Sequence, residues 1–293
     1  RSLLLYSFEK KLSLFKFLFK ILFLIIISSF NLNKIFKNKK KIIFLSHQRF
    51  RGDIEVINKK FCGLIIPYFL QTFFLFLAFN TEKKIEISNF FSKSNKEYKF
   101  GREKLRTLLC FYLIPVLKLL KVKIIISPSI HYIQDIDIGI AGKMKGINFL
   151  IFHRENLTII PNQIKALVNL YSQFDKINLD LVIFHNEKTK EIFLKSKLLN
   201  TNQTMVLGGL RMDDFLKNLN HQNNGKIISF FSFHKISSIP TDINNRKNKI
   251  DRFKKQKKGW NKLWDDMHIM FFELAKNNPN KEFILKTKWG GSW

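Results

Sequence analysis

Residues 180–216, DLVIFHNEKTKEIFLKSKLLNTNQTMVLGGLRMDDFL, decide the fold of this chain. An apolar run, a stretch with helical spacing and a second apolar run follow one another before Gly208-Gly209, so the segment predicts one strand-helix-strand unit that ends in a turn. The chain then presents Arg211 and Asp213 before it reaches the next apolar run. This order predicts that the chain leaves one domain here and enters another.

The same alternation extends to both sides of that segment. Apolar runs separated by helical stretches predict a parallel sheet with right-handed crossovers, and hence an α/β fold. The expected strands are residues 41–45, 83–88, 122–127, 148–152, 181–184, 204–207, 226–233 and 283–285. The expected helices are residues 102–120, with Pro115 as a kink, and residues 133–145, 164–174, 187–195 and 260–277. Residues 64–79 are uncharged and predict a buried helix that starts near Pro67, or a membrane-embedded hairpin.

One motif at the domain crossing resembles a known family. Residues 187–190, Glu-Lys-Thr-Lys, and the later Gly208-Gly209-x-Arg211-x-Asp213 are similar to the inter-domain crossing of two-domain GT-B glycosyltransferases of surface carbohydrate biosynthesis. The similarity is strongest to the CDP-glycerol glycerophosphotransferase-like branch.

A second motif of that family lies in residues 282–291, EFILKTKWGG. There the family has a strand that runs into Lys-x-His-Pro. Lys286 is kept, whereas Lys288 stands in place of the histidine and Trp289 in place of the proline. The resemblance covers residues 120–293. Because Lys288 replaces the family's histidine, the role of that histidine is not assigned to this chain.

The resemblance implies a GT-B-type architecture of two Rossmann-like domains with parallel sheets. We expect an apolar and basic membrane-facing helix in residues 1–38, an acceptor domain in residues 39–218, and the start of a nucleotide-donor-binding domain in residues 219–293. The chain starts without Met and stops at Trp293 directly after a predicted buried strand. Because a parallel sheet needs both faces covered, we expect a truncated fragment with an incomplete second domain.

The function that the resemblance implies is transfer of a sugar, or of a glycerol-phosphate-like group. The donor would be a nucleotide diphosphate compound and the acceptor a surface glycan or a lipid-linked molecule. No metal or other cofactor is expected, because protein cations can stabilise the leaving group. Two alternatives remain open: a UDP-sugar 2-epimerase-like enzyme of the same fold, and a non-catalytic membrane-surface binding protein.

Candidate catalytic residues follow two predicted strands, where ligand sites of parallel α/β sheets lie. His47 and Asp53 come after the first strand, and either could deprotonate an acceptor hydroxyl, although a solvated basic loop is the simpler interpretation. His153 and Glu155 lie in the string His-Arg-Glu-Asn, which resembles a string of UDP-N-acetylglucosamine 2-epimerases. The alternative for that string is a set of capping or mutually paired loop residues.

Candidate donor-binding residues supply cations and close backbone approach, the two features that hold phosphate groups. A hinge held by an Arg-Asp pair is the alternative for the glycine turn. The predicted donor-binding residues are Gly208, Gly209, Arg211, His234, Lys286, Lys288 and Gly290.

The chain has 293 residues with a net charge of +29. Such an excess of cations is typical of proteins that bind nucleic acids, anionic membranes or phosphorylated substrates. Part of it reflects the joint abundance of Lys, Asn, Ile and Phe that an AT-rich gene gives. Because the aromatic residues lie inside apolar runs rather than beside Arg on one face, a nucleic-acid partner is not expected. Cys62 and Cys110 lack metal-ligand spacing and indicate a reducing, cytoplasmic setting.

Residues 12–30 form the most apolar stretch, interrupted by Lys16 and Lys20. These two lysines share one helical face, while Ile21 and Ile25 fall on another, which describes a helix lying in a membrane interface. A core-packing helix and a transmembrane helix are the alternatives. We therefore expect a peripheral protein at the cytoplasmic face of the inner membrane, in contact with anionic lipid, or alternatively a single-pass N-terminal anchor.

Overall fold

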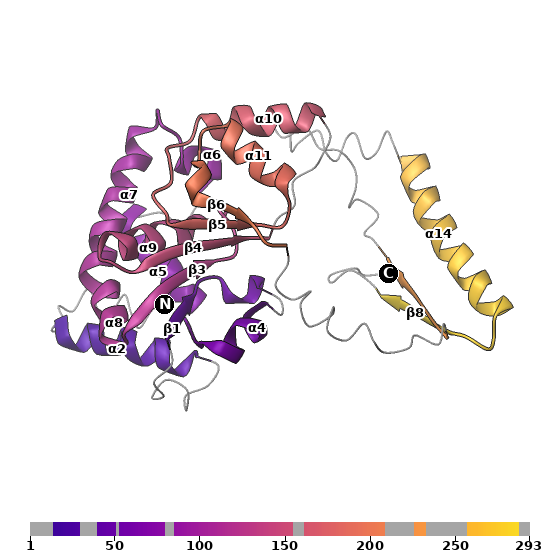
Figure 1. The fold of residues 1–293 in the computed structure, drawn as a ribbon, viewed down its shortest axis with the longest axis horizontal. Coiled ribbons are helices and arrows are strands. Elements are labelled where there is room, and N and C mark those ends of the chain that lie inside the picture. Colours follow the sequence, from indigo (N-terminus) through magenta and orange to yellow (C-terminus); the bar gives the residue numbers. More distant parts are fainter. Residues whose placement is uncertain are drawn as a thin grey trace. The chain divides into compact units, whose positions relative to one another are not determined.

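The computed structural model describes residues 14–29, 40–50, 53–79, 85–154, 161–208, 226–232 and 257–286 (Figure 1). The chain divides into two compact units, Arg1–Lys217 (unit 1) and Asn218–Trp293 (unit 2). The domain boundary expected from the sequence falls within residues 209–225, outside the described residues.

Unit 1 is built on a six-stranded sheet with the order β2-β1-β3-β4-β5-β6. Every neighbouring pair is parallel. The strands are β1 (Lys41–Phe44), β2 (Cys62–Ile65), β3 (Val122–Ser127), β4 (Asn148–His153), β5 (Leu181–Phe184) and β6 (Thr204–Val206). The expected α/β class with a parallel, Rossmann-like sheet is therefore confirmed.

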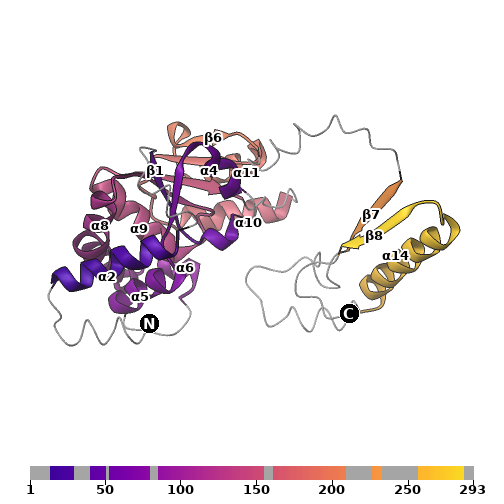
Figure 2. The same cartoon turned by 90° about the horizontal axis from the view of Figure 1, so that it is seen from below.

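Helices cover the two faces of this sheet unequally. Alternate residues of β1 point to opposite faces, so Ile43 belongs to the larger apolar core and Phe44 to a smaller one. Of the described helices, only α4 (Asp53–Lys60) contributes to the smaller core (Figure 2). The larger core contains residues from α2 (Leu14–Ile27), α5 (Tyr68–Phe79), α6 (Ile87–Phe90), α7 (Lys96–Leu108), α8 (Ile114–Leu119), α9 (Ile133–Met144), α10 (Pro161–Ser172) and α11 (Glu187–Lys195).

The strand order explains this imbalance. The chain goes from β1 to β2 on one side and then crosses back past β1 to β3, after which every step has the same direction. Because crossovers between parallel strands are right-handed, a reversal of direction moves the connecting helices to the opposite face. Only the first connection, which contains α4, therefore lies on the second face.

The structure adds one strand that was not expected and corrects one that was. β2 was not expected, because its residues run without a charge into the uncharged segment that forms α5. The strand predicted at residues 83–88 is wrong over residues 85–88, which lead into the short helix α6, while residues 83–84 lie outside the described part. The alternating letters there fit a strand, but Ile85 and Phe90 are buried in the helical layer instead.

The helix predicted for residues 102–120 has three parts, and the kink expected at Pro115 stays a prediction. It consists of α7, a π-helical segment η2 (Leu109–Leu113) and α8, in which Pro115 lies at the start. Proline has no N–H to donate and its ring crowds the preceding turn, so a wider turn directly before it relieves the clash.

α2 is an integral part of unit 1. Its residues Phe17, Ile21 and Ile25 are at most 3% exposed and belong to the larger core. The face with Ile21 and Ile25, which the sequence assigned to a membrane, therefore packs against the protein. Among the described helices, none combines the length and apolar character that crossing a bilayer requires.

Unit 2 is a strand-helix-strand unit. β7 (Ile227–Phe231) pairs in parallel with β8 (Glu282–Lys286), and α14 (Lys257–Asn277) lies between them in the chain. His268 connects the helix to the first strand, because its Nε2 lies 2.9 Å from the Ser232 hydroxyl and its Nδ1 lies 2.7 Å from the Trp264 carbonyl oxygen.

Candidate functional site

The strand order of unit 1 defines one place where a ligand site is expected. In open parallel sheets the site lies at the carboxyl ends of the strands where the direction of strand addition reverses. In this sheet that point lies between β1 and β3. The segments that leave these strands begin at Leu45 and Pro128, and the polar residues around them form the candidate site.

A buried carboxyl group joins the two strand ends. Asp135, in the first turn of α9, has no exposed surface. The Ser46 hydroxyl after β1 donates to its Oδ1 at 2.9 Å, and the Ser127 hydroxyl at the end of β3 donates to its Oδ2 at 2.9 Å. The Gln134 amide donates to Ser46 Oγ at 3.1 Å. These bonds fix the position at which the chain leaves β1.

Burial raises the pKa of Asp135 to about 7, although the two serine hydroxyls act in the opposite direction. An ionised carboxylate loses hydration energy when it is buried, and two neutral hydroxyl donors restore only part of it. The carboxyl group of Asp135 therefore changes from protonated to ionised near pH 7.

Two half-buried histidines, His47 and His131, follow the strand ends that this buried cluster joins. His47 directly follows Ser46 in the 3-10 helix η1 (His47–Arg49), and burial lowers its pKa. Its imidazole is therefore predominantly neutral at pH 7, the form that accepts a proton. His131, after β3, is half-buried and its Nε2 lies 2.7 Å from the Tyr171 hydroxyl.

One predicted candidate, Asp53, is paired across the edge of the sheet. Asp53 at the start of α4 is 4% exposed, and its Oδ2 lies 3.2 Å from Nε of Arg154, which follows β4. The pair brings the loop after β1 and the end of β4 together, so His47, Asp53 and Arg154 come from one edge of the sheet. The ion pair also means that Asp53 is held as a partner of Arg154.

His153 has a different environment from the one that its position suggested. It is fully buried at the end of β4, and its ring packs against His131, Phe184 and Phe193. Its Nδ1 lies 3.5 Å from Ser129 Oγ. This geometry favours a role in positioning the segment after β3 over direct contact with a substrate.

Few of the predicted donor residues lie in the described part of the chain. Gly208 follows β6 with φ +74°, a conformation that a residue with a Cβ rarely adopts, although a Cβ would meet no neighbour within 4 Å. Lys286 ends β8 in unit 2, with its Nζ 5.8 Å from the centre of the Phe231 ring. Glu155, Gly209, Arg211, His234, Lys288 and Gly290 lie outside the described residues.

Several residues of this site were missed by the sequence interpretation: Ser127, Ser129, His131 and Asp135. The rule that selected His47, a polar residue after a strand, applies equally to Ser127, Ser129 and His131. Asp135 gave no such signal, because its partners become visible only when β1 and β3 are known to be neighbours.

Two cavities lie away from this edge. One of about 390 Å³ is lined by residues of α2 and α8, and one of about 450 Å³ by residues of α7 and η2 and by Met144 and Lys145 at the end of α9. Neither is placed where the carboxyl ends of the strands meet. Within the described residues, no group of three or more His, Cys, Asp or Glu side chains is placed to hold a metal ion.

No family model and no curated protein matches the chain. Among solved structures, the chain is similar to a UDP-GlcNAc 2-epimerase from Neisseria meningitidis bound to UDP-GlcNAc, at 14% identity and a TM-score of 0.38, over 86% of this chain and 66% of that one. It is also similar to a UDP-N-acetylglucosamine 2-epimerase from Rickettsia bellii, at 12% identity and a TM-score of 0.36, over 86% of this chain and 63% of that one.

The chain thus spans slightly less than two thirds of the length of these two structures. Both likenesses are to epimerases rather than to the CDP-glycerol branch that the inter-domain motif resembles. At this identity and TM-score they do not decide the chemistry of the site.

Proposed function

We propose that unit 1 is the acceptor-binding part of an enzyme that uses a nucleotide-activated donor. The reaction would transfer a sugar, or a glycerol-phosphate-like group, to a surface glycan or a lipid-linked acceptor. The observation that carries the proposal is the hydrogen-bonded cluster at the ends of β1 and β3. In this cluster Ser46, Ser127 and Asp135 fix the loop that contains His47.

In this proposal His47 is the general base. A hydroxyl acceptor must lose its proton as it attacks the donor, and a neutral imidazole next to the bound hydroxyl can accept it. The lowered pKa of His47 keeps that form populated at pH 7. Asp135 fixes the base indirectly, through its bond to the neighbouring residue Ser46.

The donor part of the proposal rests on unit 2 and on the sequence motif. The strand-helix-strand arrangement places Lys286 at the carboxyl end of β8, where a parallel sheet binds nucleotides. Cations there would stabilise the negative charge that develops on a leaving nucleotide diphosphate. Arg211, His234 and Lys288 are proposed to contribute in the same way, with Gly208, Gly209 and Gly290 allowing close backbone approach.

An epimerase of a nucleotide-activated sugar is the second candidate. The string that starts at His153-Arg154 favours it, and in the structure Arg154, which follows β4, pairs with Asp53 at the start of α4. Such an enzyme would invert the configuration at one carbon of the donor sugar and would need no acceptor. The reaction products therefore distinguish an epimerase from a transferase. A non-catalytic protein that binds a membrane surface remains the candidate if no nucleotide binds.

The test begins with calorimetric titration of UDP-, CDP- and GDP-linked sugars into the chain. We expect one nucleotide class to bind, and Lys286→Ala to weaken that binding about tenfold or more, since a charge-assisted phosphate contact is lost. Lys188→Ala is the matched control, because it removes an exposed cation from α11. No binding of any nucleotide by the folded chain would overturn the proposal.

The proposed role of His47 as general base is tested in a separate experiment with acceptor molecules. Incubation of the bound donor with candidate acceptors, followed by NMR of the products, should show a transferred group and a free nucleotide. His47→Ala should lower that rate by about 10²- to 10⁴-fold and leave nucleotide affinity unchanged. Gln48→Ala, an exposed neighbour in η1, is the control. A 2-epimer of the donor formed without acceptor would replace the transferase by the epimerase.

A further inference from the structure

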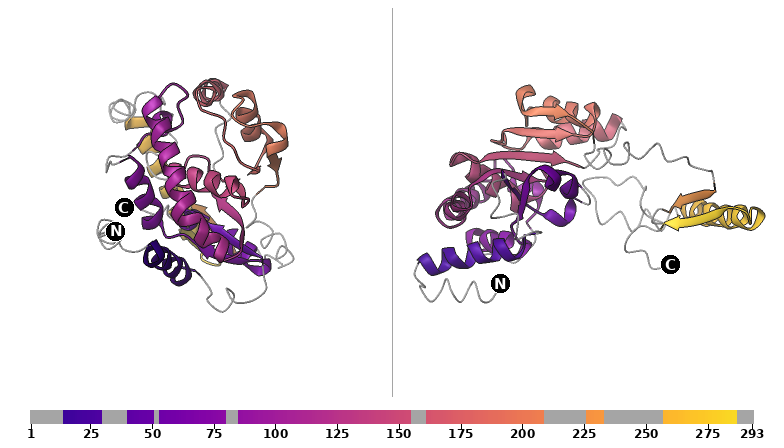
Figure 3. Two further views of the ribbon diagram at one scale, coloured as in Figure 1. Left: turned by 90° about the vertical axis from the view of Figure 1, so that its left-hand side faces the viewer. Right: turned by 60° about the horizontal axis from the view of Figure 1, so that its bottom comes forward.

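α2 carries two apolar faces, of which only one is covered by the protein. Phe17, Ile21 and Ile25 pack into the core of unit 1, but Phe19, Phe23 and Ile27 are 58%, 55% and 53% exposed. The exposed residues are spaced four apart and form a stripe along the outer side of the helix. Figure 3 shows α2, in indigo, at the periphery of unit 1 in both views.

The neighbouring elements extend this stripe into an apolar surface. α2 contacts both η2 and α8, and the cavity of about 390 Å³ between α2 and α8 is lined by Leu18, Phe19, Leu22, Pro115, Val116 and Leu119. Leu119, which lines this cavity, is 70% exposed, and Phe111 of η2, which lines the other cavity together with Glu103 and Arg106, is 57% exposed. Scattered apolar residues on a surface are normal, whereas a contiguous patch of this kind marks an interaction site.

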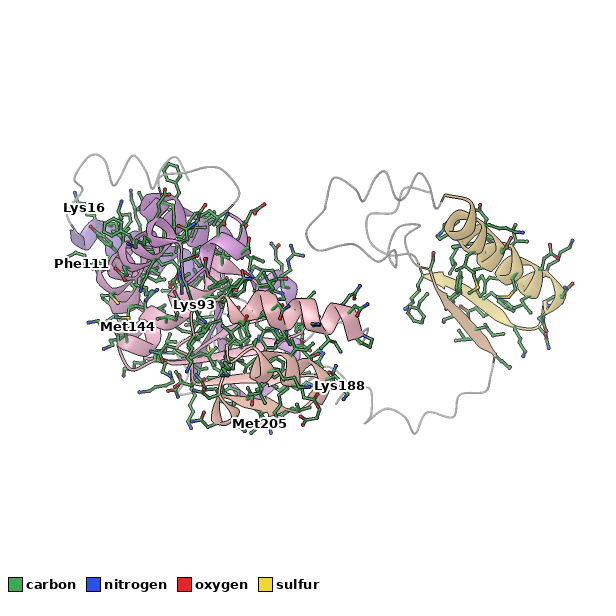
Figure 4. All side chains as sticks on the ribbon, turned by 90° about the horizontal axis from the view of Figure 1, so that it is seen from above. Lys16, Lys93, Phe111, Met144, Lys188 and Met205 are labelled. Carbon is green, nitrogen blue, oxygen red and sulfur yellow. The ribbon has the colours of Figure 1, made fainter. Side chains whose placement is uncertain are left out.

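The charges on these elements are of one sign. The sequence contains no Asp or Glu in residues 10–52 or in residues 104–134, the two segments that include α2, η2 and α8. Lys16 and Lys118 are exposed, on α2 and α8 respectively, and Lys118 directly precedes the exposed Leu119. In the view of Figure 4, Lys16 and Phe111 lie at the same end of unit 1, away from Met205.

We propose that α2, η2 and α8 form a docking face for the surface of a bilayer that contains anionic phospholipid. Aromatic and aliphatic side chains would enter the boundary between headgroups and acyl chains, while the lysines remain at the headgroups. A second copy of the chain fits this face poorly, because it would bring together two surfaces of like charge on chains that each carry +29. The face consists of residues other than those of the nucleotide proposal and does not depend on it.

The experiment is flotation of the full chain with vesicles of phosphatidylcholine alone and of phosphatidylcholine mixed with phosphatidylglycerol. We expect binding to the mixed vesicles and weaker binding to the neutral ones. Phe19→Gln with Phe23→Gln should reduce the partition coefficient at least about tenfold, because two aromatic side chains no longer enter the interface. Lys118→Gln should reduce it roughly fivefold, the equivalent of about 1 kcal/mol, and only for the anionic vesicles.

The matched control is Met205→Gln with Leu207→Gln, which removes two exposed apolar side chains of the same unit that lie at and just after β6. This variant should bind vesicles like the wild type. The proposal is overturned if the wild type binds neither vesicle, or if the control loses as much binding as the α2 variant. It is also overturned if the α2 variant dissociates an oligomer in sedimentation while vesicle binding stays unchanged, since a second copy would then cover the face. Nucleotide titrations of the same variants are expected to match the wild type.

Discussion

Two carboxylates of α9 that stand two positions apart have entirely different partners. Asp135 and Asp137 are both fully buried. Asp135 points towards the carboxyl edge of the sheet and receives only hydroxyl donors. Asp137 points towards α7, where Nε of Arg102 lies 3.2 Å from Oδ2 and Nε of Arg106 lies 2.7 Å from Oδ1.

The difference between them lies in whether a cation accompanies the buried carboxylate. Arg102 is 4% exposed and lies over the rings of Phe90 and Phe91. Its ion pair with Asp137 neutralises its charge inside the helical layer. Asp135 has no cation among the partners that fix it, and its pKa is raised accordingly. Equal burial thus yields a fixed ion pair on one side of the helix and a group that titrates near neutral pH on the other.

The largest expected effect comes from breaking the ion pair. Asp137→Asn leaves the buried guanidinium of Arg102 without its nearest carboxylate, and the free energy of unfolding should fall by about 3 to 5 kcal/mol. Urea denaturation followed by circular dichroism measures the change. Arg106→Gln, whose side chain is 25% exposed, should cost clearly less. Equal losses for the two variants would contradict the assigned order of burial.

The next effect is the pH dependence of Asp135. Because burial raises its pKa from 3.8 to about 7 in the folded protein, the folded state holds a proton that the unfolded chain has released between these values. The contribution of Asp135 to stability is therefore fully present below about pH 4, decreases as pH rises towards 7, and is absent above it. Asp135→Asn removes this contribution.

The measurement compares urea unfolding of the wild type and of Asp135→Asn near pH 5 and near pH 8. Between these conditions the wild type should lose roughly 2 to 3 kcal/mol more than the variant, from the linkage of the two pKa values. Other titrating groups cancel in this double difference. An equal loss in both proteins would show that Asp135 does not titrate in this range.

The fold could be predicted largely from local patterns. The helices at α9 and α11 and the strands at β3 and β5 were placed within one or two residues, because each is a separate run with clear punctuation, such as Gly146 after α9. β2 was missed because its short apolar run continues without a charge into the apolar residues around Pro67, which were read as one uncharged segment with α5. The alternation at residues 85–88 was misleading because burial in the helical layer outweighed it.

The candidate site could be predicted only in part. His47 and Asp53 follow the rule that polar residues after a strand line the ligand edge. Asp135 and Ser46, by contrast, are 89 positions apart and meet because β1 and β3 are neighbours. Strand order depends on tertiary packing and leaves no local signal, so the partner of Ser46 could not be read from the sequence.

A smaller effect distinguishes the donors of Asp135. Ser127→Ala removes a hydroxyl that lowers the pKa of Asp135, so that pKa should rise further. At pH 8, where the carboxylate is ionised, the free energy of unfolding should fall by about 1 to 2 kcal/mol, and near pH 5 by less. Urea denaturation at both pH values measures this. Equal losses at the two values would mean that Ser127 acts through its bond to the Ser129 carbonyl instead.

The smallest effect is expected at the other end of α9, where exposure limits an ion pair. Lys143 lies 3.0 Å from Oδ1 of Asp180 and donates to the carbonyl oxygen of Leu179 at 2.8 Å. Its side chain is 27% exposed and that of Asp180 is 36% exposed, so water screens the pair. Lys143→Gln should lower the free energy of unfolding by less than about 1 kcal/mol, and added salt should shrink the difference. A loss as large as that of Asp137→Asn would show that burial does not set the strength of ion pairs along this helix, and the contrast between its two buried carboxylates would then need another cause.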